Sequence, residues 1–335
     1  MRVQKKQIIC ILCLFGLIIS AVFAAEKKNR KDFSILYLFK NSTSYSVYNG
    51  EKLLSDFACL KGRNILELRL DRKNKDSILL AEKKDKLNRV IRLNYITNKE
   101  TVLFEFEQDI YHYSAFTENS FYWCERCENS PEPHILYEYD SRTKKIKKLY
   151  EIEDIRKSPE YSYEHDYIEN VLVDDGFIYF YVQGDFIRDS AYYVMDRSTG
   201  KVQERKMELG WSSAGGRYNN KIIREGSKVQ KTGNTKYWER DEKSCIIFDI
   251  KTQKETKCTF DKRYEAIAGP LILLSEDYFL VPLCNHPFRD SVRNGLFGNN
   301  WSVCFTVYDI KNNKPVFEGF ETETKIMKLI DAMLL

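Results

Sequence analysis

Residues 191–209 read AYYVMDRSTGKVQERKMEL, and this stretch decides the fold. An apolar run ends at Asp196, and Thr199 and Lys201 follow before a second, more polar run. An Asp side chain accepts hydrogen bonds from backbone amides two or three residues ahead, and a Thr hydroxyl supports the same turn. The stretch therefore predicts a β-hairpin in which Asp196 and Lys201 enclose a four-residue loop.

The same pattern (Asp or Asn, two residues, Thr or Asn, one residue, Lys) occurs five times. The copies start at Asn94, Asp140, Asp196, Asp249 and Asp309, at steps of 46, 56, 53 and 60 residues. Upstream of each copy lies a second turn, rich in Asn, Asp and Glu, followed by a strand-like run. Each unit thus reads as four antiparallel strands, which is typical of a β-propeller blade. We interpret the five Asp and Asn residues as turn residues rather than catalytic acids.

Five complete units occupy about residues 57–320, and two fragments remain at the ends. Residues 34–54 predict a hairpin with Asn49-Gly50 at its tip, and residues 325–335 predict one strand. We expect the fragments to form one further blade, with the innermost strand from the C-terminus, because this pairing removes an exposed sheet edge. The predicted fold is an all-β, six-bladed β-propeller; a seven-bladed ring is the alternative.

The hairpin pattern resembles that of bacterial TolB-like six-bladed propellers over roughly residues 33–320. The motif is short and is shared by many propeller families. The resemblance therefore implies a fold and carries over no activity.

The first 24 residues read as a signal peptide. Basic residues precede an apolar run over residues 8–21, and small residues at positions 22 and 24 predict cleavage before Ala25. An uncleaved anchor helix is the alternative, but a span needs about 20 apolar residues. We expect residues 25–335 to form one propeller domain, periplasmic or secreted, with no stable membrane span.

Charge and motif content exclude several classes of partner and cofactor. Outside the leader the chain has 50 basic and 49 acidic residues, and this near-neutral balance without a basic stripe argues against a nucleic-acid partner. The sequence has no phosphate-cradling loop, dinucleotide fingerprint or calcium loop. Cys124 and Cys127 form a C-x-x-C without a second ligand pair, so a local disulfide or two free thiols is favoured over zinc. No cofactor or metal is expected.

Export would permit disulfides among the seven cysteines outside the leader. Cys245 and Cys258 fall opposite each other in the hairpin of Asp249, within the separation that a disulfide needs. Cys284 and Cys304 flank a long loop on strands that are expected to pair. Two disulfides are therefore predicted, Cys245–Cys258 and Cys284–Cys304.

The long loops of a propeller lie on the face opposite its tight turns, around the mouth of the central channel. Variable loops on a rigid frame are where binding usually resides. Aromatic rings there can stack on a sugar, and Arg or His can bind an acidic group. The predicted ligand-binding residues are Tyr163, His165, Trp211, Trp238, His286, Arg289, Arg293 and Trp301.

Two functions are compatible with these patterns. The leading hypothesis is a non-enzymatic exported propeller that binds a protein or glycan ligand through its loop face. The alternative is a hydrolase or lyase acting on a carbohydrate or lactone, with Glu164, Asp166, Glu265 and His286 as candidate groups. Residues 210–216 fail the G-x-S-x-G pattern of a nucleophile elbow, and no catalytic residue is assigned.

Overall fold

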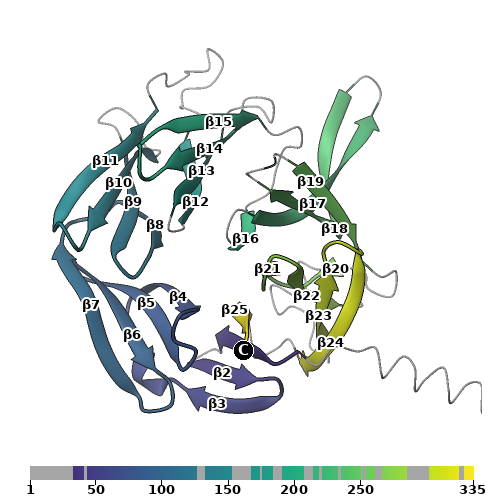
Figure 1. Ribbon diagram of the computed structural model, residues 1–335, viewed down its shortest axis with the longest axis horizontal. Coiled ribbons are helices and arrows are strands. Elements are labelled where there is room, and N and C mark those ends of the chain that lie inside the picture. Colours follow the sequence, from purple (N-terminus) through teal and green to yellow (C-terminus); the bar gives the residue numbers. More distant parts are fainter. Residues whose placement is uncertain are drawn as a thin grey trace, which may run out of the picture.

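The computed structural model describes most of the chain from Phe33 onward as strands in six sheets around a common centre (Figure 1). The sheets confirm the six-bladed β-propeller, and the seven-bladed alternative is wrong. The described residues are 33–40, 44–126, 133–152, 167–173, 176–183, 191–206, 214–218, 221–232, 235–249, 252, 254–260, 266–284, 302–323 and 328–335.

The blades follow chain order, and in blades 2 to 6 the strand nearest the centre comes first in the chain (Figure 1). Blade 2 consists of β4 (Ile65–Leu70), β5 (Ser77–Lys84), β6 (Leu87–Asn94) and β7 (Lys99–Glu107). Blade 3 consists of β8 (His112–Phe116), β9 (Ser120–Arg126), β10 (Pro133–Asp140) and β11 (Lys145–Glu151). Blade 4 consists of β12 (Tyr167–Val173), β13 (Phe177–Gln183), β14 (Ala191–Asp196) and β15 (Val202–Lys206). Blade 5 consists of β16 (Ala214–Tyr218), β17 (Lys221–Thr232), β18 (Thr235–Asp249) and β19 (Lys254–Thr259).

Blade 6 has an innermost strand that is broken in two. Its strands are β20 (Ala266–Ile267), β21 (Ile272–Leu273), β22 (Tyr278–Cys284), β23 (Ser302–Asp309) and β24 (Lys314–Glu323). β20 and β21 both pair with β22, and Gly269-Pro270 separates them. Pro270 and Pro282 have no amide hydrogen to donate, so the ladder is interrupted at this point.

Blade 1 contains both ends of the described chain. Its order is β25 (Lys328–Leu334), β1 (Ile35–Lys40), β2 (Tyr45–Asn49) and β3 (Lys52–Asp56), with the C-terminal strand innermost (Figure 1). β25 runs antiparallel to β1, with Tyr37 opposite Ala332. The predicted joining of the ends is therefore confirmed.

The predicted hairpins form as the turn chemistry requires. In all five, the first residue of the motif pairs with the Lys five positions on, which leaves a four-residue loop. The side-chain oxygen of Asp196 accepts hydrogen bonds from the amides of Ser198 and Thr199 at 2.8 and 3.0 Å. Equivalent bonds to Asn94, Asp140, Asp249 and Asp309 come from the amides of Thr97, Arg142, Thr252 and Asn312.

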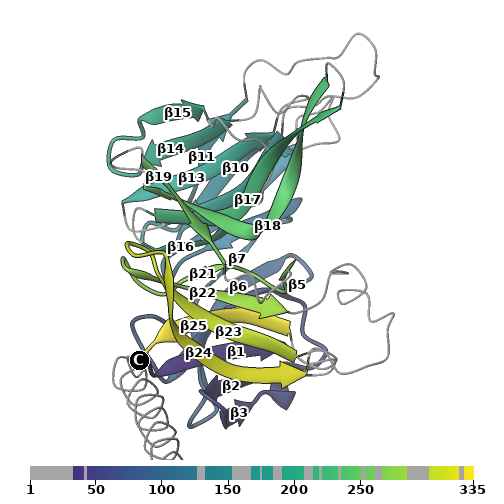
Figure 2. The same ribbon diagram turned by 90° about the vertical axis from the view of Figure 1, so that its right-hand side faces the viewer.

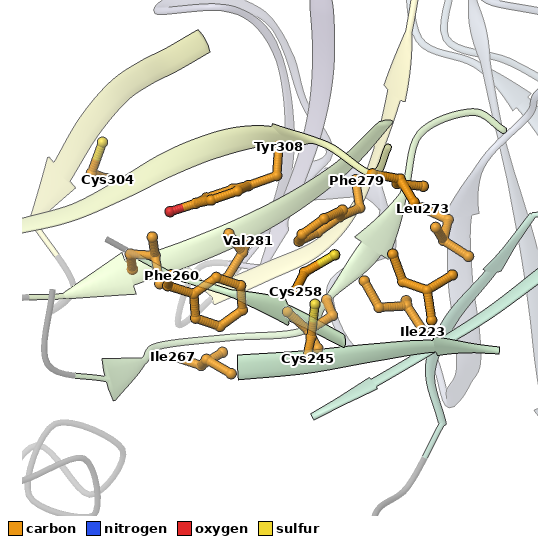
Figure 3. Packing of buried hydrophobic residues seen from close by; sticks show 14 residues of the cluster. Ile223, Cys245, Cys258, Phe260, Ile267, Leu273, Phe279, Val281, Cys304 and Tyr308 are labelled. Atoms are coloured by element: carbon orange, nitrogen blue, oxygen red, sulfur yellow. The ribbon is translucent and has the colours of Figure 1, made fainter. Parts of the chain in front are cut away.

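The described core consists of six apolar clusters, and one lies between each pair of neighbouring blades. Figure 3 shows the cluster between blades 5 and 6, where Ile223 and Cys245 face Phe279 and Tyr308. The rings of Phe279 and Tyr308 stack with their centroids 5.4 Å apart. Burial between blades rather than within one blade therefore holds the ring together.

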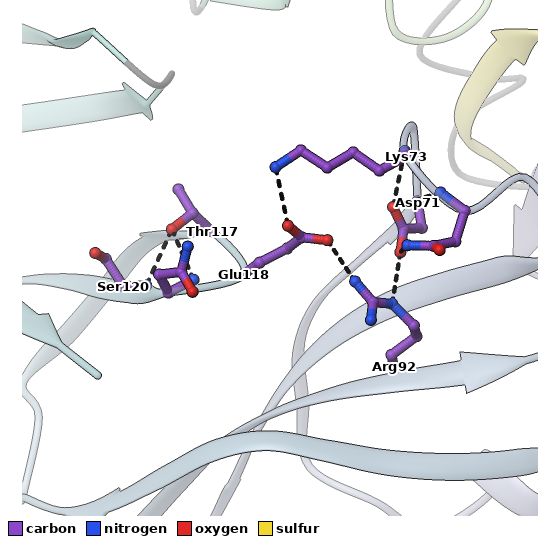
Figure 4. Close-up of polar contacts among 8 residues, drawn as sticks. Asp71, Lys73, Arg92, Thr117, Glu118 and Ser120 are labelled. Carbon is purple, nitrogen blue, oxygen red and sulfur yellow. Dashed lines mark hydrogen bonds and ion pairs between the residues drawn. The ribbon is translucent and has the colours of Figure 1, made fainter. Parts of the chain in front are cut away.

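A network of ion pairs joins blades 2 and 3 on the tight-turn face (Figure 4). Arg92 Nε lies 2.7 Å from the buried Asp71 Oδ2, and the same guanidinium binds Glu118 of blade 3. Lys73 Nζ lies 3.0 Å from Glu118. Burial alone would raise the pKa of Asp71, but hydrogen bonds from Asn74 and Arg92 outweigh it and hold that pKa below its ordinary value.

The predicted signal peptide, residues 1–24, lies outside the described residues. Within the part of the chain that is described, no helix is long and apolar enough to cross a membrane.

The first prediction concerns the contact between the C-terminal strand and blade 2. The Asp331 carboxylate accepts hydrogen bonds from the Leu70 amide at 2.9 Å and from Arg72 Nη2 at 3.1 Å. Asp331→Ala would leave both donors without this acceptor and should lower the free energy of unfolding by about 1–3 kcal/mol, measured by urea denaturation. Glu204→Ala, on the exposed side of β15, should change it by less than about 0.5 kcal/mol. Equal effects of the two substitutions would contradict this role for Asp331.

Candidate functional site

Four polar, ionisable side chains gather on the innermost strands of three adjacent blades. Glu67 and Arg69 are two residues apart on β4 and therefore share one face of that strand. The Tyr113 hydroxyl, from β8 of the next blade, donates a hydrogen bond to Glu67 Oε2. Asp331 of β25 adds a second carboxylate, which is close enough to influence Glu67 electrostatically. We call these four residues the inner cluster.

Packing fixes the geometry of the inner cluster. The Arg69 guanidinium lies over the Phe116 ring of blade 3, with its Cζ 4.2 Å from the ring centroid, which is a cation–π contact. The bond from Tyr113 to Glu67 crosses the same boundary between blades 2 and 3. The cluster therefore depends on the closed ring and cannot form within one blade.

Burial and the neighbouring groups of the inner cluster shift the pKa of Glu67 in opposite directions, and burial is the larger effect. Burial raises the pKa of Glu67, and the negative charge of Asp331 raises it further, while Arg69 and the Tyr113 hydrogen bond act in the opposite direction. Burial, followed by the Glu67 charge, raises the pKa of Tyr113 well above its ordinary value. Glu67 thus retains its proton to a higher pH than an ordinary Glu, and can donate a hydrogen bond or a proton.

The described residues contain no group of three His, Cys, Asp or Glu side chains placed to hold a metal ion.

A second feature lies on the loop face. β17 and β18, with 12 and 15 residues, are the longest strands described, and their far halves leave the ring as a two-stranded hairpin (Figures 1 and 2). We call this hairpin, residues 226–232 and 235–241, the arm. Its two strands pair with each other, and neither outer edge of the arm pairs with another described strand.

The base of the arm is a tightly packed bulge. Glu225 pairs with Cys245 but Gly226 pairs with Asp241, so residues 242–244 are extra on the β18 side. Asp241 Oδ2 accepts hydrogen bonds from Ser244 Oγ at 2.6 Å and Lys257 Nζ at 3.1 Å. A Cβ atom at Gly226 would lie 1.9 Å from Ser244 Oγ, so a larger residue does not fit without a shift there. The bulge thus sets the direction in which the arm leaves the ring.

The structure places one of the predicted ligand-binding residues. Trp238 lies on the arm, opposite Val229. The other seven lie outside the described residues, and so do the four candidate groups of the enzyme alternative. The seven are Tyr163, His165, Trp211, His286, Arg289, Arg293 and Trp301.

The inner cluster was not among the predicted site residues, because those residues were aromatic and charged side chains expected in long loops. One signal was present. In β4, which is otherwise mostly apolar, the charged residues Glu67 and Arg69 alternate with buried Leu68 and Leu70.

Neither predicted disulfide is present in the described part of the chain. Cys245 and Cys258 lie opposite each other as predicted, but the structure has both as buried free thiols, and burial raises the pKa of Cys245 well above its ordinary value. The predicted Cys284–Cys304 bond is wrong. Cys304 lies opposite Leu283, one position out of register, so the two thiols pack into clusters on opposite faces of the sheet.

Comparison with known proteins shows no family and gives only distant structural likenesses, each of those reported with a TM-score below 0.5. No family model and no curated protein matches the sequence. Among solved structures, TolB from Acinetobacter baumannii is 12% identical, with a TM-score of 0.49 over 90% of this chain and 66% of that one. A post-proline cleaving enzyme from Rickettsia typhi is 11% identical, with a TM-score of 0.47 over 88% of this chain and 46% of that one.

A third structure, the β-propeller domain of the Trilobed protease from Pyrococcus furiosus, is 14% identical with a TM-score of 0.37. The matched region covers 77% of this chain and 70% of the Pyrococcus furiosus chain. This chain spans less than two thirds of the TolB and Rickettsia typhi chains that it matches. We draw no inference about activity from likenesses at this level.

The second prediction concerns the titration of Glu67. Because its pKa in the folded state is raised, the stabilisation from its proton is fully present below the ordinary Glu pKa and is lost as the pH rises through the raised value. Tyr113→Phe removes a hydrogen bond that lowers this pKa and should raise it further. Carboxyl-carbon NMR titration measures both values, with Tyr111→Phe as the control. A Glu67 pKa at or below the ordinary value would contradict the prediction.

Proposed function

We propose that the protein is an exported, non-enzymatic binding propeller that engages a protein partner through its loop face. The observation that carries the proposal is the arm, whose outer edges pair with no other described strand. An unpaired edge presents a row of backbone donors and acceptors, to which an extended segment of another protein can add as a further strand.

The anchoring of the arm supports this role. The bulge at Gly226 and the bonds from Ser244 and Lys257 to Asp241 fix its base before any partner arrives. A binding element that is already ordered loses less conformational entropy on association, which favours affinity.

The charge of the arm indicates the chemistry of the partner. Residues 227–240 contain Lys228, Lys231, Lys236 and Arg240 against one acid, Glu239, in a chain that is otherwise close to neutral. Edge lysines also discourage pairing between two copies of the same arm. We therefore propose an extended segment rich in Asp or Glu as the partner, because opposite charge accelerates encounter and selects the partner.

One observation favours the alternative function, a hydrolase or lyase acting on a carbohydrate or lactone. The raised pKa of Glu67 beside Arg69 and Tyr113 is the property that a general acid needs. If this alternative is correct, turnover of such a substrate by the purified protein would be abolished by Glu67→Gln and unaffected by loss of the arm.

The third prediction tests the binding role of the arm. A photo-cross-linking residue replaces Gln230 on the arm in one variant, and Gln203 on β15 in the matched control, both in the exporting cell. A discrete protein adduct is expected from position 230 and not from position 203, detected by denaturing gel and mass spectrometry. Replacing residues 227–240 by Asn-Gly, a tight-turn pair, in a variant labelled elsewhere on the loop face should remove the adduct and leave the melting temperature of the ring unchanged.

Equal adducts at positions 230 and 203, or none at either, would contradict the proposal. An adduct with a glycan and not with a protein would contradict the protein partner and would identify the ligand as a glycan.

A further inference from the structure

An open recess of about 600 Å³ lies on the tight-turn face of blade 2, away from the arm. Its lining comes from the turn before β5 and from the ends of β5, β6 and β7 that adjoin this face. Four basic residues, Lys73, Lys75, Arg92 and Lys99, contribute to it, and Asp76 is the one acidic residue among the described residues that do. This balance of charge favours an anionic ligand.

The strand register brings the lining side chains of blade 2 together. Ser77 of β5 lies opposite Asn94 of β6, and Asn94 lies opposite Lys99 of β7. Opposite residues of antiparallel strands have Cα atoms about 4.5–5.5 Å apart. Arg92 and Thr101 form the next such pair on the same face, because side chains two residues apart in a strand share a face. These five side chains therefore lie on the face of blade 2 that carries the apolar cluster shared with blade 3.

Arg92 is held in place by two acidic side chains that do not line the recess. Its Nε atom binds Asp71 and its Nη2 atom binds Glu118 (Figure 4). Glu118 also binds Lys73, so these two basic and two acidic residues balance one another. The third nitrogen of the guanidinium, Nη1, forms no hydrogen bond or ion pair with any residue that the structure describes. A donor that is already fixed in position is thus left for a ligand.

Four further donors at the recess have no partner within the described part of the chain. The ammonium groups of Lys75 and Lys99 form no ion pair there. Ser77 is only 3% exposed, and its hydroxyl forms no hydrogen bond to a described residue. The side-chain oxygen of Asn94 accepts a hydrogen bond from the Thr97 amide, which leaves its amino group as a donor. A buried hydroxyl without a protein partner is rare, and it indicates that a ligand or water completes the site.

We propose that the recess binds the phosphate monoester of a polyol, for example glycerol 3-phosphate. A phosphate group has three terminal oxygens that are strong hydrogen-bond acceptors, whereas a carboxylate has two oxygens in one plane. The donors of the recess come from three strands and from the turn before β5, so they approach a ligand from several directions and suit the tetrahedral group better. Lys75 and Lys99 supply positive charge for the dianion.

The acidic lining residue and the size of the recess indicate the polyol. The Asp76 carboxylate offers only acceptor oxygens, so it repels a further phosphate oxygen but can accept a hydrogen bond from a ligand hydroxyl. The turn that presents Asp76 is fixed, because its carbonyl oxygen accepts a hydrogen bond from the Tyr95 amide at 2.9 Å. The Tyr95 hydroxyl also donates to the carbonyl oxygen of Lys75. A recess of about 600 Å³ has room for a short carbon chain beside the phosphate.

The fourth prediction compares four probes by isothermal titration calorimetry on the purified protein at constant ionic strength. Glycerol 3-phosphate is expected to bind. Glycerate, which has a carboxylate in place of the phosphate ester, should bind at least about tenfold more weakly. Propyl phosphate, which keeps the phosphate and lacks the hydroxyls, should bind about three- to tenfold more weakly. Inorganic phosphate that binds as tightly as glycerol 3-phosphate would contradict the polyol and identify free phosphate as the ligand.

Matched variants locate the site. Lys75→Gln combined with Lys99→Gln should weaken binding of glycerol 3-phosphate by at least about tenfold, and Ser77→Ala by about two- to fivefold. Lys84→Gln combined with Lys86→Gln removes the same charge from exposed positions at the other end of β5, and this control should leave binding unchanged. Glycerol 3-phosphate should also raise the melting temperature of the unsubstituted protein, because it binds only the folded ring.

A further variant tests the two parts of the ligand separately. Asp76→Ala removes the acceptor for a ligand hydroxyl and leaves the phosphate donors in place. It should therefore abolish the difference in affinity between glycerol 3-phosphate and propyl phosphate. A difference that persists in this variant would contradict the role of Asp76.

Two results would overturn the proposal as a whole. One is equal weakening by the two pairs of lysine substitutions, or glycerate binding as tight as that of glycerol 3-phosphate, which would show attraction by net charge alone. The other is neither heat nor a shift in melting temperature with millimolar glycerol 3-phosphate. Neither result bears on the partner of the arm, which lies on the opposite face.

Discussion

A four-stranded sheet with apolar side chains on both faces cannot bury both by itself, and the rest of the structure depends on this constraint. Blade 2 shows it within one strand. In β5, Leu80 packs into the cluster shared with blade 1, whereas its neighbours Leu79 and Ala81 pack into the cluster shared with blade 3. Because the side chains of a strand alternate between faces, each blade needs a neighbour on both sides. A closed ring meets this requirement for every blade.

The same constraint explains where the two ends of the described chain lie. If the ring were open at blade 1, the cluster between blades 6 and 1 and the cluster between blades 1 and 2 would both lose one wall. β1 and β25 come from opposite ends of the described chain, and their pairing completes blade 1. Side chains from both strands then cover the two clusters. The Asp331 carboxylate then links β25 to Leu70 and Arg72 of blade 2. The ring thus provides a frame on which the inner cluster and the arm are positioned.

The repeat, the blade number and the ring closure could be predicted from sequence because turn chemistry is local. Asp196 and its four counterparts bind backbone amides two or three residues away, and a fixed loop length sets the register that places Cys245 opposite Cys258. Residues 285–301 separate β22 from β23, so no short turn motif sets their register, and the prediction there was wrong by one residue at Cys304. A shift of one residue moves a side chain to the other face.

The inner cluster could not be predicted because its contacts join different blades. Glu67 and Tyr113 are 46 residues apart, and they meet only when the ring brings β4 beside β8. The left-handed conformation at the end of four hairpin loops was not predicted either, since it occurs at three different residue types, in Asn98, Lys144, Gly200 and Asn313. Their position after the Asp or Asn, rather than their chemistry, determines that conformation.

Native-state hydrogen exchange of the backbone amides in β1 and β25 tests the central claim, that closure of the ring stabilises every blade, most directly. If closure is part of the global structure, these amides should exchange with the same free energy as the amides of β5, through unfolding of the whole ring. Exchange of β25 through a separate opening of lower free energy, with the other blades still protected, would show that the remaining blades are stable without closure and would contradict the claim.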